Sequence, residues 1–558
     1  MNPLQGPPPD PGSEKRILLA FVLTFVVIIA MQPLVSRYVK PAQPPTQQAS
    51  QPAQTPPSPA AAPSAATPPP SPVPTARKEA SKKGKTAQAP VPPTKQASAE
   101  FETVIDNDLY RITFTNRGAQ VKSWVLKKYD DEKRKPLELV HTAAAQQYGY
   151  PLSLWTWDEA LRKKLNSALY LPHDDGPPDS RPCSGAGECG NKTLTAPATV
   201  TFEYSDGALS VRKTFAFDHS YVVRVETRVE QEGAPVAALV AWPAGFGDQA
   251  TPSSYASGQI TYQYLDTVER IAAKKISGGH TINGPLQWAG AGDQYFAAVF
   301  LPDDPQSAAL VTLESTLQLP RNPEKPDPND KPLEEPVVGM AAGNMNGVTA
   351  GRFFAGPKAL QVLDLVHSVP VAAGGRMVSP DLEKLVDFGK WFGFLARPLF
   401  LWLEWTHDHW VANWGWSIII LTLIITAAVM PLRVTSMKSA LKMQRFQPQM
   451  KAIQERYKQK AAGLKMADPR RQEIMQQQNQ ELSVLYKKEG INPAGGCVPM
   501  LLQMPFLIAF YSMLGVTIEL RHAGFFWVHD LSSADPWHIL PILVAACATA
   551  RRAARCGP

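Results

Sequence analysis

The chain has 558 residues, of which 44% are hydrophobic, and a formal net charge of +7. A chain of this length is too long to fold around one hydrophobic core, so we expect several domains. The hydrophobic fraction is too low for membrane spans along the whole chain, so any spans must be confined to short segments. The five cysteines show no metal-binding spacing, although Cys183 and Cys189 are close enough in sequence to form a disulfide if that region is outside the cytoplasm.

The first apolar segment, residues 17–36, is predicted to be a transmembrane anchor that follows a cytoplasmic N-terminus, residues 1–16. A cleaved signal peptide is the alternative, but the uncharged stretch is long and shows no small-residue cleavage motif. Residues 41–98 contain sixteen prolines and no aromatic residue. Such a segment buries too little apolar surface to fold, so we expect a disordered linker.

Residues 99–375 are predicted to form a large antiparallel β-sandwich. Val223, Val225 and Val229 alternate with charged residues, and Asp206-Gly207 is typical of a hairpin turn between two further strands. The acids and histidines of this region show no spacing that indicates a metal site or a catalytic site, so we expect neither there.

Residues 380–409 place Trp and Phe at helical spacing opposite charged side chains, which is typical of an amphipathic helix at a membrane interface. A core helix of a soluble domain is the alternative. The next segment, residues 410–432, is an uncharged stretch of bilayer length with Trp414 and Trp416 near its start. We predict that this segment is a transmembrane helix.

Residues 433–490 carry thirteen Lys or Arg against five Asp or Glu, a net charge of 13 − 5 = +8. A short loop of this charge is predicted to be cytoplasmic by the positive-inside rule. Ile453 and Tyr457 belong to an apolar stripe at helical spacing, and a second stripe follows Pro469. The segment therefore predicts two helices in an antiparallel hairpin.

Residues 493–518 are predicted to be a transmembrane helix, since the stretch is uncharged from Ala494. Pro499, Gln503 and Pro505 are unusual there, because Gln and the backbone groups that Pro frees prefer to face protein or water. An ordinary span with one packed polar side chain is the alternative. A loop outside the cytoplasm, residues 519–538, and a partial span with an aberrant tail, residues 539–558, complete the chain.

Several motifs resemble those of the YidC-type membrane protein insertases of Gram-negative bacteria. They are NWGWSIII (413–420), TSMKSALKMQRFQPQM (435–450), LYKKEGINPAGGCVPMLLQMPF (485–506), HDLSSADPWHILPIL (529–543) and, in the β region, LYRITFTNRGAQVKSW (109–124). The resemblance implies a multi-pass protein of the bacterial inner (plasma) membrane. Its fold would combine an α-helical transmembrane insertase core, a large periplasmic antiparallel β-sandwich domain and a cytoplasmic helical hairpin.

The resemblance also implies a function. In that family the membrane helices enclose a hydrophilic groove that admits nascent membrane proteins to the bilayer without a nucleotide, so we expect no enzyme activity, cofactor or metal. The implied partners are nascent membrane proteins, the phospholipid bilayer, the Sec translocon and the ribosome or signal-recognition-particle receptor, with no sequence-specific nucleic-acid binding. The implied groove residues are Thr422, Thr426, Cys497, Leu501, Gln503 and Met504; that Gln503 faces the groove is our own inference.

Two features depart from the family pattern. The usual intramembrane arginine falls on Thr426, whose hydroxyl keeps a groove polar but does not attract an acidic substrate tail. After Leu543 the chain reads VAACATARRAARCGP, whereas the family continues this helix and adds two more. We therefore expect a C-terminally truncated insertase.

Two other classes of function compete with the insertase. A membrane-anchored periplasmic carbohydrate-binding protein fits a large β-sandwich but leaves the basic hairpin unexplained. A channel or transporter would have more spans and an internal repeat, and the sequence shows no repeat.

Overall fold

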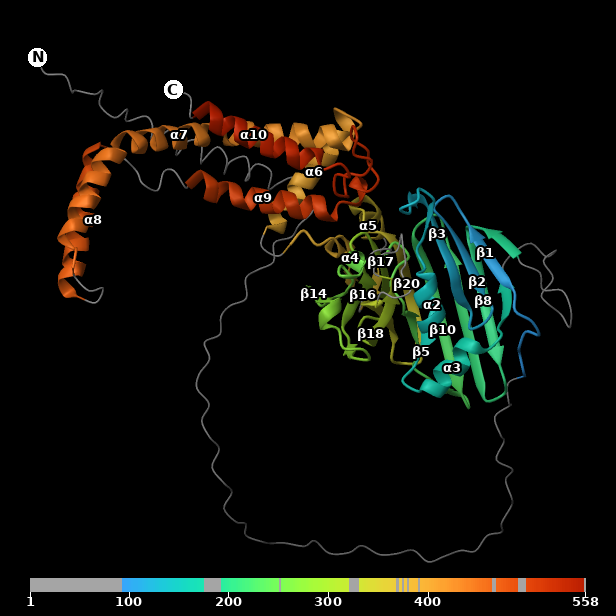
Figure 1. Cartoon of the computed structure of the whole chain (residues 1–558). Coiled ribbons are helices and arrows are strands. Elements are labelled where there is room, and N and C mark those ends of the chain that lie inside the picture. Colours follow the sequence, from blue (N-terminus) through green and yellow to red (C-terminus); the bar gives the residue numbers. More distant parts are fainter. Residues whose placement is uncertain are drawn as a thin grey trace, which may run out of the picture. The chain divides into compact units, whose positions relative to one another are not determined.

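The computed structural model describes residues 93–174, 192–249, 252–320, 331–367, 371–373, 376–378, 381–389, 392–463, 468–489 and 498–555. The predicted segments 1–16 and 17–36, most of the predicted linker 41–98, and the Cys183–Cys189 pair lie outside these residues. Figure 1 shows that the strands precede the long helices along the chain.

The largest sheet has ten strands, all paired antiparallel. In spatial order, nine of them are β14 (Thr267–Ala272), β13 (Gln259–Tyr264), β16 (Leu286–Gly292), β17 (Phe296–Pro302), β20 (Val348–Pro357), β10 (Val222–Gln231), β9 (Leu209–Phe217), β8 (Ala198–Ser205) and β6 (Leu171–Asp174). The tenth, β11 (Ala234–Pro235), pairs with the end of β10.

Two five-stranded sheets complete the sandwich. One has the order β4 (Pro136–Glu138), β3 (Gln120–Asp130), β2 (Tyr110–Thr115), β1 (Glu102–Asp106) and β7 (Lys192–Thr195), and β1 pairs with β7 in parallel. The other has the order β15 (Thr281–Asn283), β18 (Ala308–Leu319), β19 (Leu333–Asn344), β12 (Leu239–Trp242) and β5 (Ser153–Trp155). Shorter elements are α2 (Thr142–Tyr148), α3 (Glu159–Ser167), α4 (Pro252–Tyr255), η1 (Ala273–Lys275), α5 (Leu360–His367), β21 (Val371–Ala373) and β22 (Arg376–Val378).

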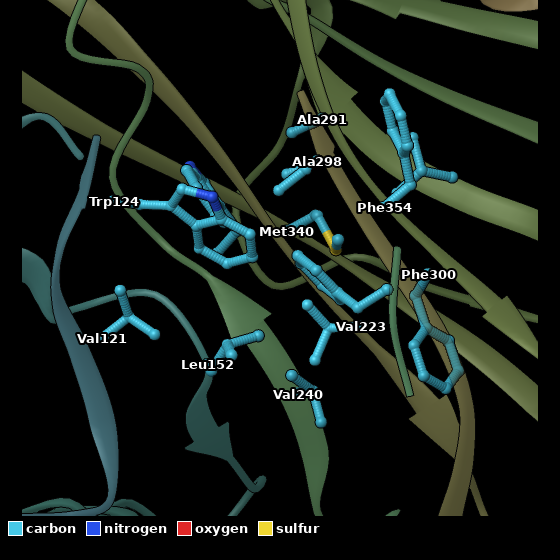
Figure 2. Close-up of a cluster of buried hydrophobic side chains, with 14 of the residues drawn as sticks. Val121, Trp124, Leu152, Val223, Val240, Ala291, Ala298, Phe300, Met340 and Phe354 are labelled. Carbon is cyan, nitrogen blue, oxygen red and sulfur yellow. The ribbon is translucent and has the colours of Figure 1, made fainter. Parts of the chain in front are cut away.

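Aromatic side chains from all three sheets meet in one core. Trp242 of β12 stacks on Phe353 of β20 with ring centroids 6.2 Å apart, and Trp124 of β3 lies 5.9 Å from Trp242. Figure 2 shows Trp124 in this cluster with Met340 of β19 and Val223 of β10 nearby. Each large ring removes much apolar surface from water, so the sheets are held face to face by this core.

The predicted strand periodicity and hairpin are both confirmed. Val223, Val225 and Val229 are buried while Arg224 and Arg228 of the same strand are exposed, as alternation requires. Strands β8 and β9 pair antiparallel around Asp206-Gly207, where the Asp206 carboxylate accepts the Leu209 N–H at 2.8 Å and Gly207 has φ +95°. The β-sandwich is therefore antiparallel as predicted, except for the parallel pair of β1 and β7.

The linker boundary differs from the prediction. We assigned residues 93–98 to the disordered linker, but the N–H groups of Lys95 and Ser205 each donate to the other residue's carbonyl at 2.8 Å, and Ala97 is buried. Pairing with the end of β8 satisfies the backbone hydrogen-bonding groups of Lys95. The linker therefore ends before residue 98, the boundary that composition alone predicted. The β-sandwich includes these residues.

The long helices follow the sandwich. They are α6 (Gly393–His409), α7 (Trp414–Lys460), α8 (Pro469–Glu489), α9 (Val498–Val516) and α10 (Ile539–Arg555), with short 3-10 turns η2 (Leu382–Leu385) before α6 and η4 (Ile518–Leu520) after α9. Within the described part of the chain, one helical stretch, Trp414–Pro431, is long and apolar enough to cross a membrane, and Gln503–Val516 is a shorter apolar stretch.

Two helix boundaries differ from the predicted segments. In the segment 380–409 the α-helix begins only at Gly393, because Leu382 and Leu385 pack into the β-sandwich core instead. Helix α7 continues without a break from the predicted span 410–432 into the predicted hairpin 433–490. The half of α7 that begins at Arg433 is rich in Lys, Arg, Gln, Ala and Met, which are good helix formers, so the change in charge does not end the helix.

Candidate functional site

Three helices pack together next to the β-sandwich. The buried face of α6, with Leu399 and Leu403, contacts Leu421 of α7 and Met513 of α9. The first turn of α7 is capped by Asn413, whose carboxamide oxygen accepts the Gly415 N–H at 3.0 Å. The arrangement leaves most apolar side chains of α7 and α9 exposed or half-buried, as expected of helices that face lipid.

The predicted groove residues fall into three groups. Thr422 of α7 is half-buried and its hydroxyl donates to the Ile419 carbonyl at 2.8 Å, whereas Thr426, one turn later, is exposed. Gln503 of α9 is half-buried and Met504 beside it is 43% exposed. The backbone of Leu501 lies in α9, but its side chain and the whole of Cys497 lie outside the described residues.

One polar contact joins α7 to α9, and the sequence analysis did not foresee it. The Arg433 guanidinium donates to the Gln503 carboxamide oxygen at 2.8 Å. Arg433 is seven residues after Thr426, so it projects from the same face of α7 about 10 Å further along the axis. The i, i+7 spacing on the polar side of an otherwise apolar helix is the signal that would have found it.

The basic hairpin is formed by the second half of α7 and by α8. Ile453 and Tyr457 are buried in the described structure, and Arg456 of α7 forms a salt bridge with Glu481 of α8 at 3.0 Å. The predicted stripe on α7 is thus the face that packs on α8. The remaining Lys and Arg side chains are largely exposed, which leaves a basic surface.

The loop between α9 and α10 is docked on the β-sandwich. Ile518 belongs to the sandwich core, and the Gln294 side chain donates to the Gly515 carbonyl at 2.6 Å. The Arg134 guanidinium donates to the carbonyls of His522 at 3.2 Å and His529 at 2.9 Å. The end of α9 is therefore fastened to the sandwich by apolar packing and by hydrogen bonds.

A buried charge cluster lies at this junction. The Arg521 guanidinium stacks over the rings of Tyr295 and Phe296 at 5.6 and 5.5 Å. Near it lie the carboxyl of Asp248 and that of the buried Asp293. Burial, and then the negative charge of Asp293, raise the pKa of Asp248, whereas Arg521 opposes that shift. Burial therefore favours the protonated form of Asp248.

A second acid at the junction is also perturbed. Glu519 follows the end of α9, where burial raises the pKa of its carboxyl to about 7, and the nearby Glu404 carboxylate of α6 adds to the shift. Glu404 accepts a hydrogen bond from Gln361 of α5. Among the described residues no group of three or more His, Cys, Asp or Glu is placed to hold a metal ion.

Two family models match the chain, one to each structural region. Residues 102–402 match the YidC periplasmic domain, and residues 405–554 match the 60Kd inner membrane protein family. The second match extends beyond Leu543, the point at which the motif resemblance ended. Together the two matches cover the β-sandwich and the helices.

Relatives with similar sequences bear the same name. A protein of Syntrophus aciditrophicus named membrane protein insertase YidC is 29% identical over 543 residues, which is 96% of this chain and 89% of that protein. A protein of Burkholderia multivorans with the same name is 29% identical over 478 residues, 82% of this chain and 75% of that protein. A solved structure of an active YidC insertase is 18% identical over 82% of this chain and 81% of that chain, with a TM-score of 0.27.

Proposed function

The chain belongs to the YidC family of membrane protein insertases, and from that premise we propose that α7 and α9 line the path by which its substrates enter the bilayer. The protein is an inner-membrane insertase with a periplasmic β-sandwich, and it acts on nascent membrane proteins rather than as an enzyme. The carbohydrate-binding alternative is not favoured by this membership.

The Arg433–Gln503 contact carries the proposal of a hydrophilic groove. A guanidinium and a carboxamide are costly in hydrocarbon, so they are retained between two apolar helices only where they serve a polar path or each other. Thr422, Thr426, Gln503 and Met504 lie on the same two helices as this contact. We assign Cys497 and Leu501 to the same groove from the family resemblance. Such a groove shortens the apolar distance that a polar substrate tail must cross.

The same contact supports a charge-based step in substrate capture. Thr426 has no charge, so in this chain Arg433, the first cation along α7, is the one nearest the proposed groove that an acidic substrate tail would meet. Its position about two helical turns beyond Thr426 places it nearer the basic hairpin, and therefore nearer the cytoplasm. An acidic tail would be attracted there first and then pass along the polar face of α7.

The topology of the helices is part of the proposal. Besides the apolar stretch Trp414–Pro431, we propose that α9 and the N-terminal segment 17–36 cross the membrane, so that the protein is multi-pass. The basic hairpin then lies in the cytoplasm, where its exposed Lys and Arg side chains suit the ribosome or the signal-recognition-particle receptor. The Sec translocon is a further proposed partner.

Site-specific photocrosslinking tests the groove. A photoreactive amino acid at Thr426 or at Met504 should capture a ribosome-bound nascent membrane protein, because both positions would face the path. Ile424 is the matched control, since it is exposed on the same helix but lies 2 × 100°, about 200°, around the axis from Thr426. Equal capture at Thr426 and Ile424 would show that substrates contact α7 without a preferred face, and the groove would be refuted.

A further inference from the structure

A short hairpin in the loop between η4 and α10 presents an exposed aromatic ring. The Phe525 N–H donates to the Val528 carbonyl at 2.7 Å, and the Val528 N–H donates back to the Phe525 carbonyl at 2.9 Å. Phe526 and Trp527 are thus the two central residues of the turn. The Trp527 indole N–H donates to the Asp535 carboxylate at 3.3 Å, whereas Phe526 is 71% exposed.

The backbone at the tip of this hairpin is strained. Phe526 has φ +51°, a conformation that Gly or Asn adopts easily and that a bulky side chain rarely adopts. Holding a phenylalanine there costs free energy, and a ring in water gives no burial to offset that cost. The combination of backbone strain and exposure indicates that the Phe526 ring contacts an apolar environment in the working protein.

The hairpin is fixed to the first turn of the apolar helix α7. The Asn413 side chain donates to the Gly524 carbonyl at 3.2 Å, and the Trp416 ring lies 5.6 Å from Phe525 and 5.9 Å from Phe526 in edge-to-face contacts. A Cβ on Gly415 would lie 2.2 Å from the Phe525 ring, so glycine is what lets the hairpin approach. The hairpin is therefore held level with the start of the candidate span, and the docked β-sandwich puts it on the periplasmic side.

We propose that the Phe525–Val528 hairpin is a membrane anchor whose Phe526 ring, together with Trp416, inserts into the periplasmic leaflet of the phospholipid bilayer. Aromatic side chains at the ends of spans prefer the headgroup level, and this pair continues the surface of α7 that already faces lipid. The anchor fixes the depth of the α9–α10 loop, and with it the periplasmic end of the proposed groove. The lipid contact itself does not depend on the groove.

The test uses the full chain in vesicles of phosphatidylethanolamine and phosphatidylglycerol. With the five native cysteines replaced by serine, a nitroxide is attached to Phe526→Cys or to Leu265→Cys. Leu265 is a matched control, because it is 54% exposed, has φ +53° and lies between β13 and β14 of the sandwich. We expect collisions with oxygen, relative to a water-soluble nickel chelate, to be severalfold more frequent at 526 than at 265.

Two outcomes would overturn the proposal. Equal collision ratios at 526 and 265 would place the ring in water. Shielding of position 526 from both reagents would place it against protein, either a second copy or another membrane protein.

Should the cysteine variants fail to fold, the unaltered protein can be labelled with a membrane-dissolved carbene precursor and, separately, with hydroxyl radicals. Phe526 should then have a severalfold higher carbene-to-hydroxyl ratio than the exposed Trp157 of the sandwich, and an equal ratio would again refute the anchor.

Discussion

The buried acids Asp248 and Asp293 at the junction should respond very differently to the same chemical change. Burial favours the neutral form of Asp248, so Asp248→Asn replaces one neutral group by another and should alter stability by less than about 1 kcal/mol near neutral pH. Asp293→Asn removes the negative charge that acts on the buried Lys358 ammonium, which also donates to the Asp293 carbonyl. Leaving a buried cation without its anion costs about 3–5 kcal/mol.

Hydrogen exchange on the full chain measures this cost where it arises. The free energy of local opening for residues 515–522 and 293–296 should fall by about that amount in Asp293→Asn, because these segments meet at the junction. In Asp248→Asn the same amides should exchange as in the wild type. Equal effects of the two substitutions, or a larger effect of Asp248→Asn, would refute the assignment of the proton to Asp248.

The pH dependence gives an independent check on this proton. The folded state holds the Asp248 proton above the usual carboxyl pKa of 3.8, so the unfolded chain releases a proton that the folded chain keeps. The stability from this group is full at low pH and is lost as pH rises through the raised folded pKa. Asp248→Asn should remove that loss, and an unchanged pH profile would contradict the raised pKa.

Three further predictions concern the helices. Arg433→Gln should slow insertion of substrates with acidic tails several-fold while Arg433→Lys keeps most activity, and an equal defect for neutral-tailed substrates would argue against a charge effect. Gly415→Ala should destabilise the protein by about 1–3 kcal/mol through its clash with Phe525, and thermal unfolding should show that Phe525→Ala relieves most of this. The pKa of Glu519 is about 7 in the folded protein against an ordinary 4.5, so raising the pH through 7 should lower the free energy of unfolding by up to about 3 kcal/mol, less where solvent reaches the carboxyl. Unfolding measured at a series of pH values should show that Glu519→Gln abolishes this dependence.

Local sequence patterns were enough to predict the β-sandwich and one apolar helix of this chain. The alternation around Val223 encodes a strand with one buried face, and Asp206-Gly207 encodes a turn, because both depend on neighbouring residues only. The uncharged stretch before Pro431 likewise encodes an apolar helix of bilayer length. The sharp change of charge at Arg433 predicts that the residues after it lie in the cytoplasm. It carries no information on where the helix ends, because charge does not set helix propensity, and α7 continues through it.

Only the tertiary structure decided which polar groups meet. Arg433 and Gln503 are 70 residues apart, and Asp248, Asp293 and Arg521 come from two sandwich loops and the α9–α10 loop. Alternation places Lys213 on the same inward face as Val211 and Phe215, although it is charged. It is fully buried, and its ammonium donates to three backbone carbonyls. Periodicity states that a side chain points inward or outward. Which partner it finds there depends on how distant segments pack, and that information is absent from any local window.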